Sequence, residues 1–294
     1  MRILSRLLNN CRKPDRQIGM ELGISGGAVG SRISKMEKLG IIEKFCLKVE
    51  PPLLGLNMFY IVVNSQNQKE IIKNVKLAGM PFTIVPCVGG NTVIGVIVKE
   101  DMEQKIELLQ KLMQDVRVMS VFEADNTKIT HNLTRTDLEI LKQLIENPRK
   151  RIEQLSKETE LSTKTINRGL EKLENNESIQ FTLVFDPSKI EGFLCYAVVA
   201  ITQEDISKML KRFEDEFSED YLMIPFLAKN QIVLFLYSDS IFKMDEMTEK
   251  IAKVDGTITT ELFIPKKIDM PEKWLEKRLE TLTKSQTLHI SQVN

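Results

Sequence analysis

The chain repeats one stretch of sequence, which runs LSRLLNNCRKPDRQIGMELGISGGAVGSRISKMEKLGII at residues 4–42 and LKQLIENPRKRIEQLSKETELSTKTINRGLEKLENNESI at residues 141–179. The two copies align without a gap at a shift of 137 residues, and 11 of the 39 pairs are identical. Apolar pairs such as Val29/Ile166 keep their character between these identities. A repeat of this length indicates a duplicated structural unit, so we expect the same architecture twice.

Each copy of the stretch has the pattern of three short helices. The third helix of each copy starts at a serine, Ser25 or Ser162, which is a good N-cap. The extended runs Ile41–Val49 and Ile179–Phe185 follow and are expected to form a wing. We expect the helices at Ile3–Leu8, Asp15–Leu22 and from Ser25 onward in copy one, and at Asp137–Glu146, Arg151–Glu160 and Thr163–Asn175 in copy two. Two helices joined by a tight turn, the second one capped, indicate a helix-turn-helix.

The remainder of each copy alternates strands rich in Val, Ile and Phe with amphipathic helices, in the order β-α-β-β-α-β. This order is typical of ferredoxin-like domains. In copy one the segments are Met58–Val63, Lys69–Leu77, Phe82–Val88, Thr92–Lys99, Met102–Leu112 and Arg117–Phe122. In copy two they are Leu194–Thr202, Asp205–Phe217, Tyr221–Leu227, Ile232–Tyr237, Ile241–Ala252 and Thr257–Ile264.

The predicted fold class is α+β, with two tandem units that each join a winged helix-turn-helix to a ferredoxin-like βαββαβ domain. Proline after Glu50 and after Asp186 marks the boundary inside each unit. The predicted segments are winged helix-turn-helix 1 at 1–50, ferredoxin-like domain 1 at 51–127, winged helix-turn-helix 2 at 128–185, ferredoxin-like domain 2 at 186–268, and a C-terminal amphipathic helix (Pro271–Leu282) and tail at 269–294.

Charge is divided unevenly along the chain, although the net charge is zero. Residues 1–50 carry ten Lys and Arg against five Asp and Glu, residues 129–185 carry nine of each, and residues 186–268 carry ten against fifteen. A basic first segment is expected if one module contacts phosphate and another does not.

Membrane, export and metal functions find little support in the sequence. No segment approaches the ~18 continuous apolar residues of a membrane helix, and Met1–Arg6 turns polar too early for a signal peptide. We therefore expect a cytoplasmic protein. The four cysteines form no CxxC pair, and neither His131 nor His289 lies near one in sequence. We expect no metal and no cofactor, with the cysteines packed as small apolar side chains.

Several short motifs resemble the feast/famine regulators of the Lrp/AsnC family. They include Leu22-Gly23-Ile24-Ser25, Gly40-Ile41-Ile42 and the turn Cys87-Val88-Gly89-Gly90-Asn91. The resemblance covers nearly the whole chain and implies a DNA-binding transcriptional regulator whose ferredoxin-like domains bind a small-molecule effector. It departs from the family in having two units per chain. Effector-sensing members commonly have a Gly…Asp turn; copy one keeps Gly89, Gly90 and Asn91 there, so these are our candidate effector-binding residues, whereas copy two has Ala228-Lys229-Asn230.

Candidate DNA-binding residues come from the loop before the second helix and from the third helix of each copy. Arg and Lys suit phosphate, whereas Asn and Arg side chains recognise base edges in the major groove. Copy one is basic but its third helix is rich in glycine, so we expect it to supply mainly phosphate affinity and copy two mainly sequence choice. The candidates are Arg12, Lys13, Ser25, Gly26, Gly27, Ser31, Arg32, Lys35, Arg149, Lys150, Ser162, Thr163, Lys164, Asn167 and Arg168.

Two other functions stay open. The neutral second copy is compatible with an interaction or effector-sensing module that does not bind DNA. Siroheme decarboxylases resemble the same family and can occur as fused pairs, but they share a His-Asn-Tyr-Arg-like stretch in the ferredoxin-like part, and no histidine falls there in this chain. Family members pair through their ferredoxin-like sheets. The two copies could therefore pair within one chain or with a second chain, and closed two-fold symmetry favours a homodimer with four helix-turn-helix units.

Overall fold

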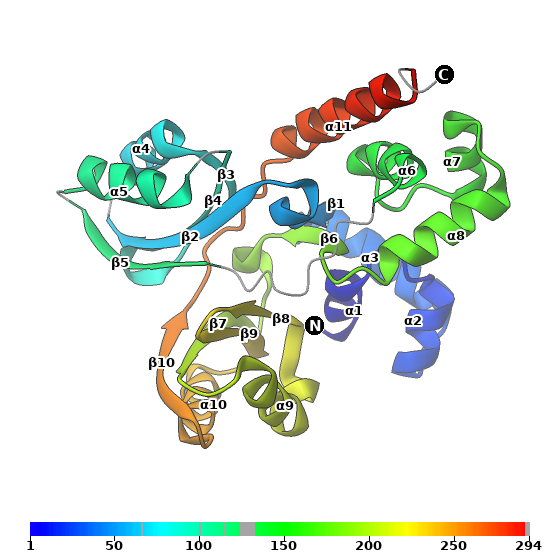
Figure 1. Ribbon diagram of the computed structural model, residues 1–294. Helices are drawn as coiled ribbons and strands as arrows, with labels where there is room; N and C mark the ends of the chain where they lie inside the picture. The colour runs from blue at the N-terminus through cyan, green and yellow to red at the C-terminus, as the bar shows by residue number, and fades with distance from the viewer. Residues whose placement is uncertain (66, 100, 115, 124–132, 292–294) are drawn as a thin grey trace.

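The computed structural model describes residues 1–65, 67–99, 101–114, 116–123 and 133–291, with side chains as far as residue 284 (Figure 1). The predicted boundary between residues 127 and 128 lies outside these residues, as does His131. In the first unit the elements are α1 Arg2–Asn9, α2 Asp15–Leu22, α3 Gly26–Lys38, β1 Ile42–Val49, β2 Asn57–Asn64, α4 Gln68–Ala78, β3 Met80–Pro86, β4 Asn91–Val98, α5 Met102–Leu112 and β5 Arg117–Phe122.

The second unit repeats this order. Its elements are α6 Arg135–Glu146, α7 Ile152–Thr159, α8 Thr163–Glu174, β6 Ile179–Phe185, β7 Leu194–Thr202, α9 Ile206–Phe217, β8 Tyr221–Ala228, β9 Gln231–Ser238, α10 Ile241–Lys253 and β10 Thr257–Phe263. These bounds confirm the predicted elements to within two residues. The C-terminal helix α11, Lys273–Ser291, extends nine residues beyond the predicted end at Leu282.

Each ferredoxin-like domain is a four-stranded antiparallel sheet covered by two helices on one face. The strand orders are β3-β4-β2-β5 and β10-β7-β9-β8, so the first strand of each domain lies in the middle of its sheet. Helices α4 and α5 cover one face of strand β2, where Phe59 and Ile61 lie in the core, and the opposite face, with Tyr60 and Val62, is buried as well. The split-βαβ prediction is therefore confirmed in both copies.

The two runs expected to form wings are strands, but they do not form a separate hairpin in each unit. Strand β1 pairs antiparallel with β6 in a two-stranded sheet, with Phe45 opposite Leu183 and Cys46 opposite Thr182. Each strand of this ribbon follows the third helix of its own helix-turn-helix unit: β1 follows α3, and β6 follows α8. The wing expectation is thus corrected: one ribbon is shared between the two units.

The two ferredoxin-like sheets also pack against each other within the chain. The Tyr60 ring meets the Phe226 ring edge-on at 5.0 Å between centroids. Val62 and Cys87 share a buried cluster with Phe263 of the other sheet. The backbone N–H of Val88 donates to the carbonyl of Ile264 at 2.8 Å. The repeats therefore pair inside one chain; a homodimer of the chain stays a prediction.

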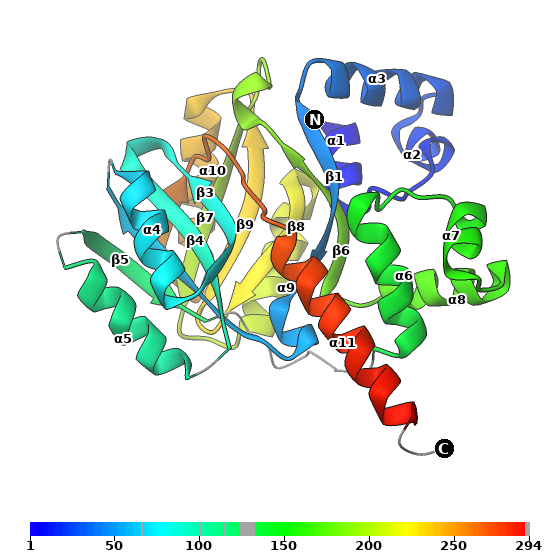
Figure 2. The ribbon, with the colours of Figure 1, turned by 90° about the horizontal axis from the view of Figure 1, so that it is seen from above.

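Both helix-turn-helix units lie at one end of the molecule and both ferredoxin-like domains at the other, with the β1–β6 ribbon between them (Figures 1 and 2). The arrangement has approximate two-fold symmetry, which α11 breaks. Trp274, Leu275 and Leu279 of α11 are buried in one cluster with Leu138 and Leu141 of α6. No helix within the described ranges is long and apolar enough to cross a membrane.

Candidate nucleic-acid interface

In each unit the last helix, α3 or α8, has the place of the recognition helix, which lies in the major groove of DNA in helix-turn-helix proteins. The Ser25 hydroxyl accepts a hydrogen bond from the Ala28 N–H at 3.1 Å, and the Ser162 hydroxyl accepts one from the Thr165 N–H at 3.1 Å. Both predicted N-caps are confirmed. Since each helix N-terminus carries partial positive charge and unpaired N–H groups, it is suited to lie against a phosphate.

The turn before each recognition helix uses left-handed backbone. Gly23 has φ of 68° in the first unit, as its lack of a side chain allows. Glu160 takes the same place in the second unit with φ of 58°, and is the only non-glycine residue with positive φ in the part of the chain that the structure describes. The second turn therefore has the same shape at a conformational cost.

The outer face of α3 is built from small residues and a few cations. Gly27, Ser31, Arg32 and Lys35 are exposed. Gly26 is different: a Cβ there would lie 3.0 Å from the Arg16 Cα, so glycine lets α2 and α3 cross closely. Helix packing therefore accounts for the glycine at position 26, and its predicted contact with DNA stays a prediction.

The outer face of α8 is built from longer polar side chains. Thr163, Lys164, Asn167 and Arg168 are all exposed over the first two turns, while Ile166 faces the core. The structure thus places all four of these predicted residues on one accessible surface. Such side chains are long enough to reach base edges from a helix lying in the major groove.

The predicted phosphate contact Arg12 is instead a contact between the two helix-turn-helix units. Its side chain is 10% exposed. The guanidinium donates to the carbonyls of Pro148 and Lys150, forms an ion pair with Glu174 at 3.3 Å, and lies over the Phe181 ring. Burial lowers the pKa of Arg12, and the Glu174 carboxylate opposes that shift. With Nε and Nη1 engaged in this way and the side chain largely buried, Arg12 is a poor candidate for a phosphate contact.

Arg149, the equivalent of Arg12, makes the reciprocal contact. Its guanidinium lies 4.8 Å from the centroid of the Phe45 ring and pairs with Asp15 at 3.2 Å. Phe45 and Phe181 are equivalent on β1 and β6 at a shift of 136 residues, the shift that also places Glu50-Pro51 on Asp186-Pro187. The identity of Arg12 and Arg149 in the repeat is therefore explained by an internal, nearly two-fold interface, and this interface argues against their predicted role in DNA binding.

The two lysines of this loop are also held by the protein. Lys13 pairs with Glu21 at 2.5 Å, and Lys150 pairs with Glu158 at 2.6 Å. The two ion pairs are equivalent in the repeat, since Lys13 and Lys150 are 137 positions apart, and so are Glu21 and Glu158. Lys150 is the more enclosed, with a side chain 6% exposed. Lys13 and Lys150 therefore stabilise their own units and are poor candidates for phosphate contacts.

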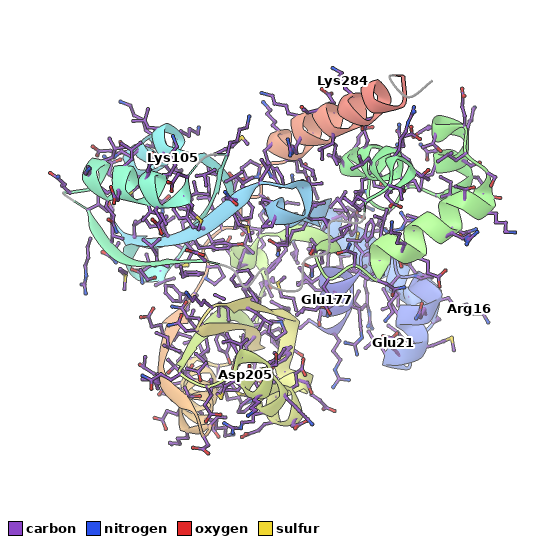
Figure 3. The ribbon with its side chains drawn as sticks, in the orientation of Figure 1. Arg16, Glu21, Lys105, Glu177, Asp205 and Lys284 are labelled. Carbon is purple, nitrogen blue, oxygen red and sulfur yellow. The ribbon has the colours of Figure 1, made fainter. Side chains whose placement is uncertain are left out.

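The same two units carry further exposed cations that were not among the candidate DNA-binding residues. They include Arg16 on α2, Lys38 in the last turn of α3, and Arg151 directly before α7. Figure 3 shows Arg16 on the outer surface of α2. Nothing in the sequence distinguishes them from Arg12 or Lys150, because the difference is side-chain burial and ion pairing in the folded protein.

The predicted effector turn lies at the contact between the two ferredoxin-like domains. Gly89 and Gly90 have φ of 79° and 87°, which explains both glycines. The Asn64 amide donates to the Gly89 carbonyl at 3.0 Å and to the Asn91 side chain at 2.6 Å. The structure thus brings the three predicted residues together, with an amide of the same chain bound to the turn.

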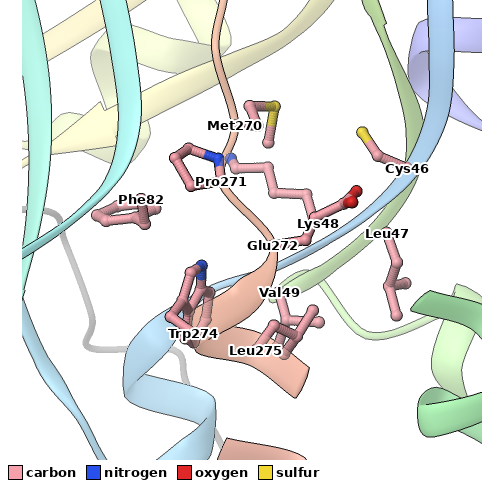
Figure 4. A pocket seen from close by; sticks show the side chains of 10 residues that line it. All are labelled: Cys46, Leu47, Lys48, Val49, Phe82, Met270, Pro271, Glu272, Trp274 and Leu275. Atoms are coloured by element: carbon pink, nitrogen blue, oxygen red, sulfur yellow. The ribbon is translucent and has the colours of Figure 1, made fainter. Parts of the chain in front are cut away.

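Two cavities adjoin the start of α11. The smaller, about 20 Å³, lies among β1, Phe82 and Trp274 and has room for about one water molecule (Figure 4). The larger is an open cleft of about 640 Å³ between β3, α4 and the segment before α11. Within the described residues, no three His, Cys, Asp or Glu side chains are grouped to hold a metal ion.

Comparison with known proteins supports the helix-turn-helix assignment. A family model described as "Winged helix-turn-helix DNA-binding" matches residues 1–43 and 133–180. The chain is 40% identical to the HTH-type transcriptional regulator Ptr1 of Methanocaldococcus jannaschii over 62 residues, which are 21% of this chain and 42% of Ptr1. It is 28% identical to the HTH-type transcriptional regulator LrpA of Pyrococcus horikoshii over 110 residues, 36% of this chain and 78% of LrpA.

One solved structure is similar over nearly the full length. The siroheme decarboxylase NirDL aligns with 99% of this chain and 98% of its own, with a TM-score of 0.51 and 14% sequence identity. At 14% identity this likeness shows the fold alone. It covers both halves of the chain, so NirDL has the same tandem arrangement of two units. Two winged helix-turn-helix matches, with transcriptional regulators as relatives, make the chain similar to helix-turn-helix regulators of the Lrp/AsnC type, with two such units in tandem.

Proposed function

We propose that this protein is a sequence-specific DNA-binding transcriptional regulator. The observation that carries the proposal is the pair of N-capped recognition helices, α3 and α8, whose polar outer faces are exposed at the same end of the molecule. The names of the relatives, HTH-type transcriptional regulators, support it.

We assign the phosphate contacts to the cations that the fold leaves exposed. Arg16, Arg32, Lys35 and Lys38 belong to the basic first segment, and Arg151 to the second unit. Each phosphate that such a cation neutralises releases counterions from the duplex, so affinity falls as salt rises. In this proposal Arg12, Lys13 and Lys150 contribute only through stability.

The test is fluorescence anisotropy with a labelled duplex, titrated at several salt concentrations. We expect binding to random duplex that weakens steeply between 50 and 200 mM salt, as phosphate contacts require. The double variant Arg16→Ala/Lys38→Ala should bind less tightly and with a shallower salt dependence. The matched control is Lys250→Ala, an exposed lysine on α10. Absence of binding to any duplex at the lowest salt would refute DNA binding and favour an interaction module.

Modulation by a small-molecule effector is the second part of the proposal. The Gly89-Gly90-Asn91 turn supports it because this turn lies where the two ferredoxin-like domains meet. A ligand there would contact both domains at once. If Gly89→Val leaves every ligand-dependent change in DNA binding intact, the effector does not bind at this turn.

Siroheme decarboxylase activity is a second candidate, favoured by the full-length likeness to NirDL. Against it, the two histidines of the chain, His131 and His289, both fall outside the ferredoxin-like segments 51–127 and 186–268. An absorbance titration with an iron tetrapyrrole distinguishes the two functions. Stoichiometric binding of the tetrapyrrole, followed by release of carbon dioxide from it, would establish the enzyme. An unchanged absorbance spectrum would favour the regulator.

A further inference from the structure

The two recognition helices present different chemistry at equivalent positions. At a shift of 137 residues, each outer position of α3 has a partner on α8. The four pairs are Gly27/Lys164, Gly30/Asn167, Ser31/Arg168 and Ser34/Glu171. At these four positions α8 carries long polar side chains and α3 carries only Gly or Ser, while the exposed cations of α3, Arg32 and Lys35, lie at other positions.

The fold does not account for the glycine at position 27. A Cβ at this position would have no atom within 4 Å, in contrast to Gly26, whose Cβ would meet the Arg16 backbone. Glycine inside a helix is disfavoured relative to alanine. A glycine that costs helix stability and serves no packing role indicates a close approach by something outside the protein.

Pairing within the chain holds these two faces in one arrangement. The β1–β6 ribbon joins the units, and the reciprocal contacts of Arg12 on Phe181 and Arg149 on Phe45 hold the two helix-turn-helix bodies together. In a symmetric homodimer both recognition surfaces would be identical. Here one chain carries two recognition surfaces with unequal side chains.

We infer that one chain binds one non-palindromic duplex site made of two unequal half-sites, an inference that rests on the proposed function. The half-site under α8 is recognised through bases, by Lys164, Asn167 and Arg168. The half-site under α3 is recognised through its backbone and groove shape, since small residues allow the helix to approach closely and offer few groups for base edges.

The experiment starts from duplexes selected in vitro from a random pool with the full-length protein. We expect a site with one well-defined half and one loosely defined half, bound by one chain per duplex in light scattering of the complex. Duplexes that carry the α8 half-site twice, or the α3 half-site twice, should bind about tenfold more weakly than the selected site.

Two variants assign the halves. Arg168→Ala should relax base preference in the well-defined half alone and weaken binding to the selected site about tenfold or more. Gly27→Ala should leave the melting temperature equal or higher and still weaken DNA binding, because the added methyl group increases the distance of closest approach. Lys250→Ala is the control and should change neither quantity.

A palindromic selected site bound by two chains would overturn the inference while leaving the proposed function intact. The same holds if Gly27→Ala binds as tightly as the parent protein, which would remove the assigned role of α3. Failure of the proposed function gives a different result, since then no duplex would be enriched at all.

Discussion

The two helix-turn-helix units have the same fold but different support. In the first, α1 packs directly on β8 of the opposite ferredoxin-like domain: the Ser5 hydroxyl donates to the Tyr221 carbonyl at 3.4 Å, and the Ile224 N–H donates to the Asn9 side chain at 3.1 Å. In the second, α11 covers α6, and Arg278 of α11 donates to the Leu54 carbonyl at 2.6 and 2.9 Å. Helix α11, which lies outside the repeat, thus covers α6, whereas strand β8 of a ferredoxin-like domain covers α1.

This difference teaches that duplication preserves the interface near the symmetry axis and lets the periphery diverge. Near the axis, β1 and β6 and the two arginine–phenylalanine contacts are equivalent. Away from it, the turn residues, the recognition faces and the cover of the first helix all differ. The four predictions below test that division.

The largest expected effect comes from the cover of the second unit. Leu279 is fully buried between α11 and α6, so Leu279→Ala should lower the free energy of unfolding by about 2–5 kcal/mol through lost burial and the cavity left behind. Hydrogen exchange should become faster in α6. Helix α1 is the internal control, because α11 does not cover it; equal acceleration in both helices would contradict separate support.

The central interface gives the next effect. Arg12→Ala removes the guanidinium that donates to the Pro148 and Lys150 carbonyls and leaves the Glu174 carboxylate with the Asn10 amide as its donor, which should cost about 2 kcal/mol in urea denaturation. Arg149→Ala removes a more exposed pair with Asp15 and should cost about 1 kcal/mol or less. If Arg12→Ala instead keeps its stability and flattens the salt dependence of DNA binding, this residue contacts phosphate after all.

The two turns differ by one residue and offer a matched pair of variants. Glu160→Gly should stabilise the protein by about 1 kcal/mol, because glycine adopts the left-handed conformation without strain. Gly23→Glu should destabilise it by a similar amount. Melting temperatures of the two variants check this, and shifts of the same sign would show that the turns are not equivalent.

The smallest effect concerns pH. A hydrogen bond from Lys150 lowers the pKa of Glu158, and one from Lys13 lowers the pKa of Glu21. Such pairs stabilise the fold above the usual carboxylate pKa of about 4.3 and stop doing so as pH falls through the lowered value. At pH 7 Glu158→Gln should reduce the melting temperature more than Glu21→Gln, since Lys150 is the more buried partner. If the melting temperatures of the two variants still differ at a pH below the lowered carboxylate pKa values, the ion pairs are not the cause of that difference.

Local structure was predictable from local sequence. The caps at Ser25 and Ser162 and the order of strands and helices followed from short-range patterns, because capping and amphipathic spacing involve residues within a few positions of each other. The extended runs at β1 and β6 were recognised as strands for the same reason. Their pairing with each other was not, since it joins residues at least 130 positions apart.

The candidate site was only partly predictable, because exposure depends on packing between distant segments. Lys164, Asn167 and Arg168 were predicted correctly to lie on the accessible face of α8. Arg12 and Arg149 are identical in the repeat, and that identity is equally compatible with DNA contact and with an interface across the axis. The contacts across the two units, with Phe181 and Glu174 for Arg12 and with Phe45 and Asp15 for Arg149, distinguish the two explanations.

The ribbon of β1 and β6 also has a consequence for assembly. Between separate chains such pairing is second order and weakens on dilution, whereas within one chain the partner is present at a fixed, high effective concentration. The paired state therefore needs no threshold amount of protein. A substitution on either strand also enters the ribbon once and not twice, so each half of the molecule is able to change without imposing the same change on the other.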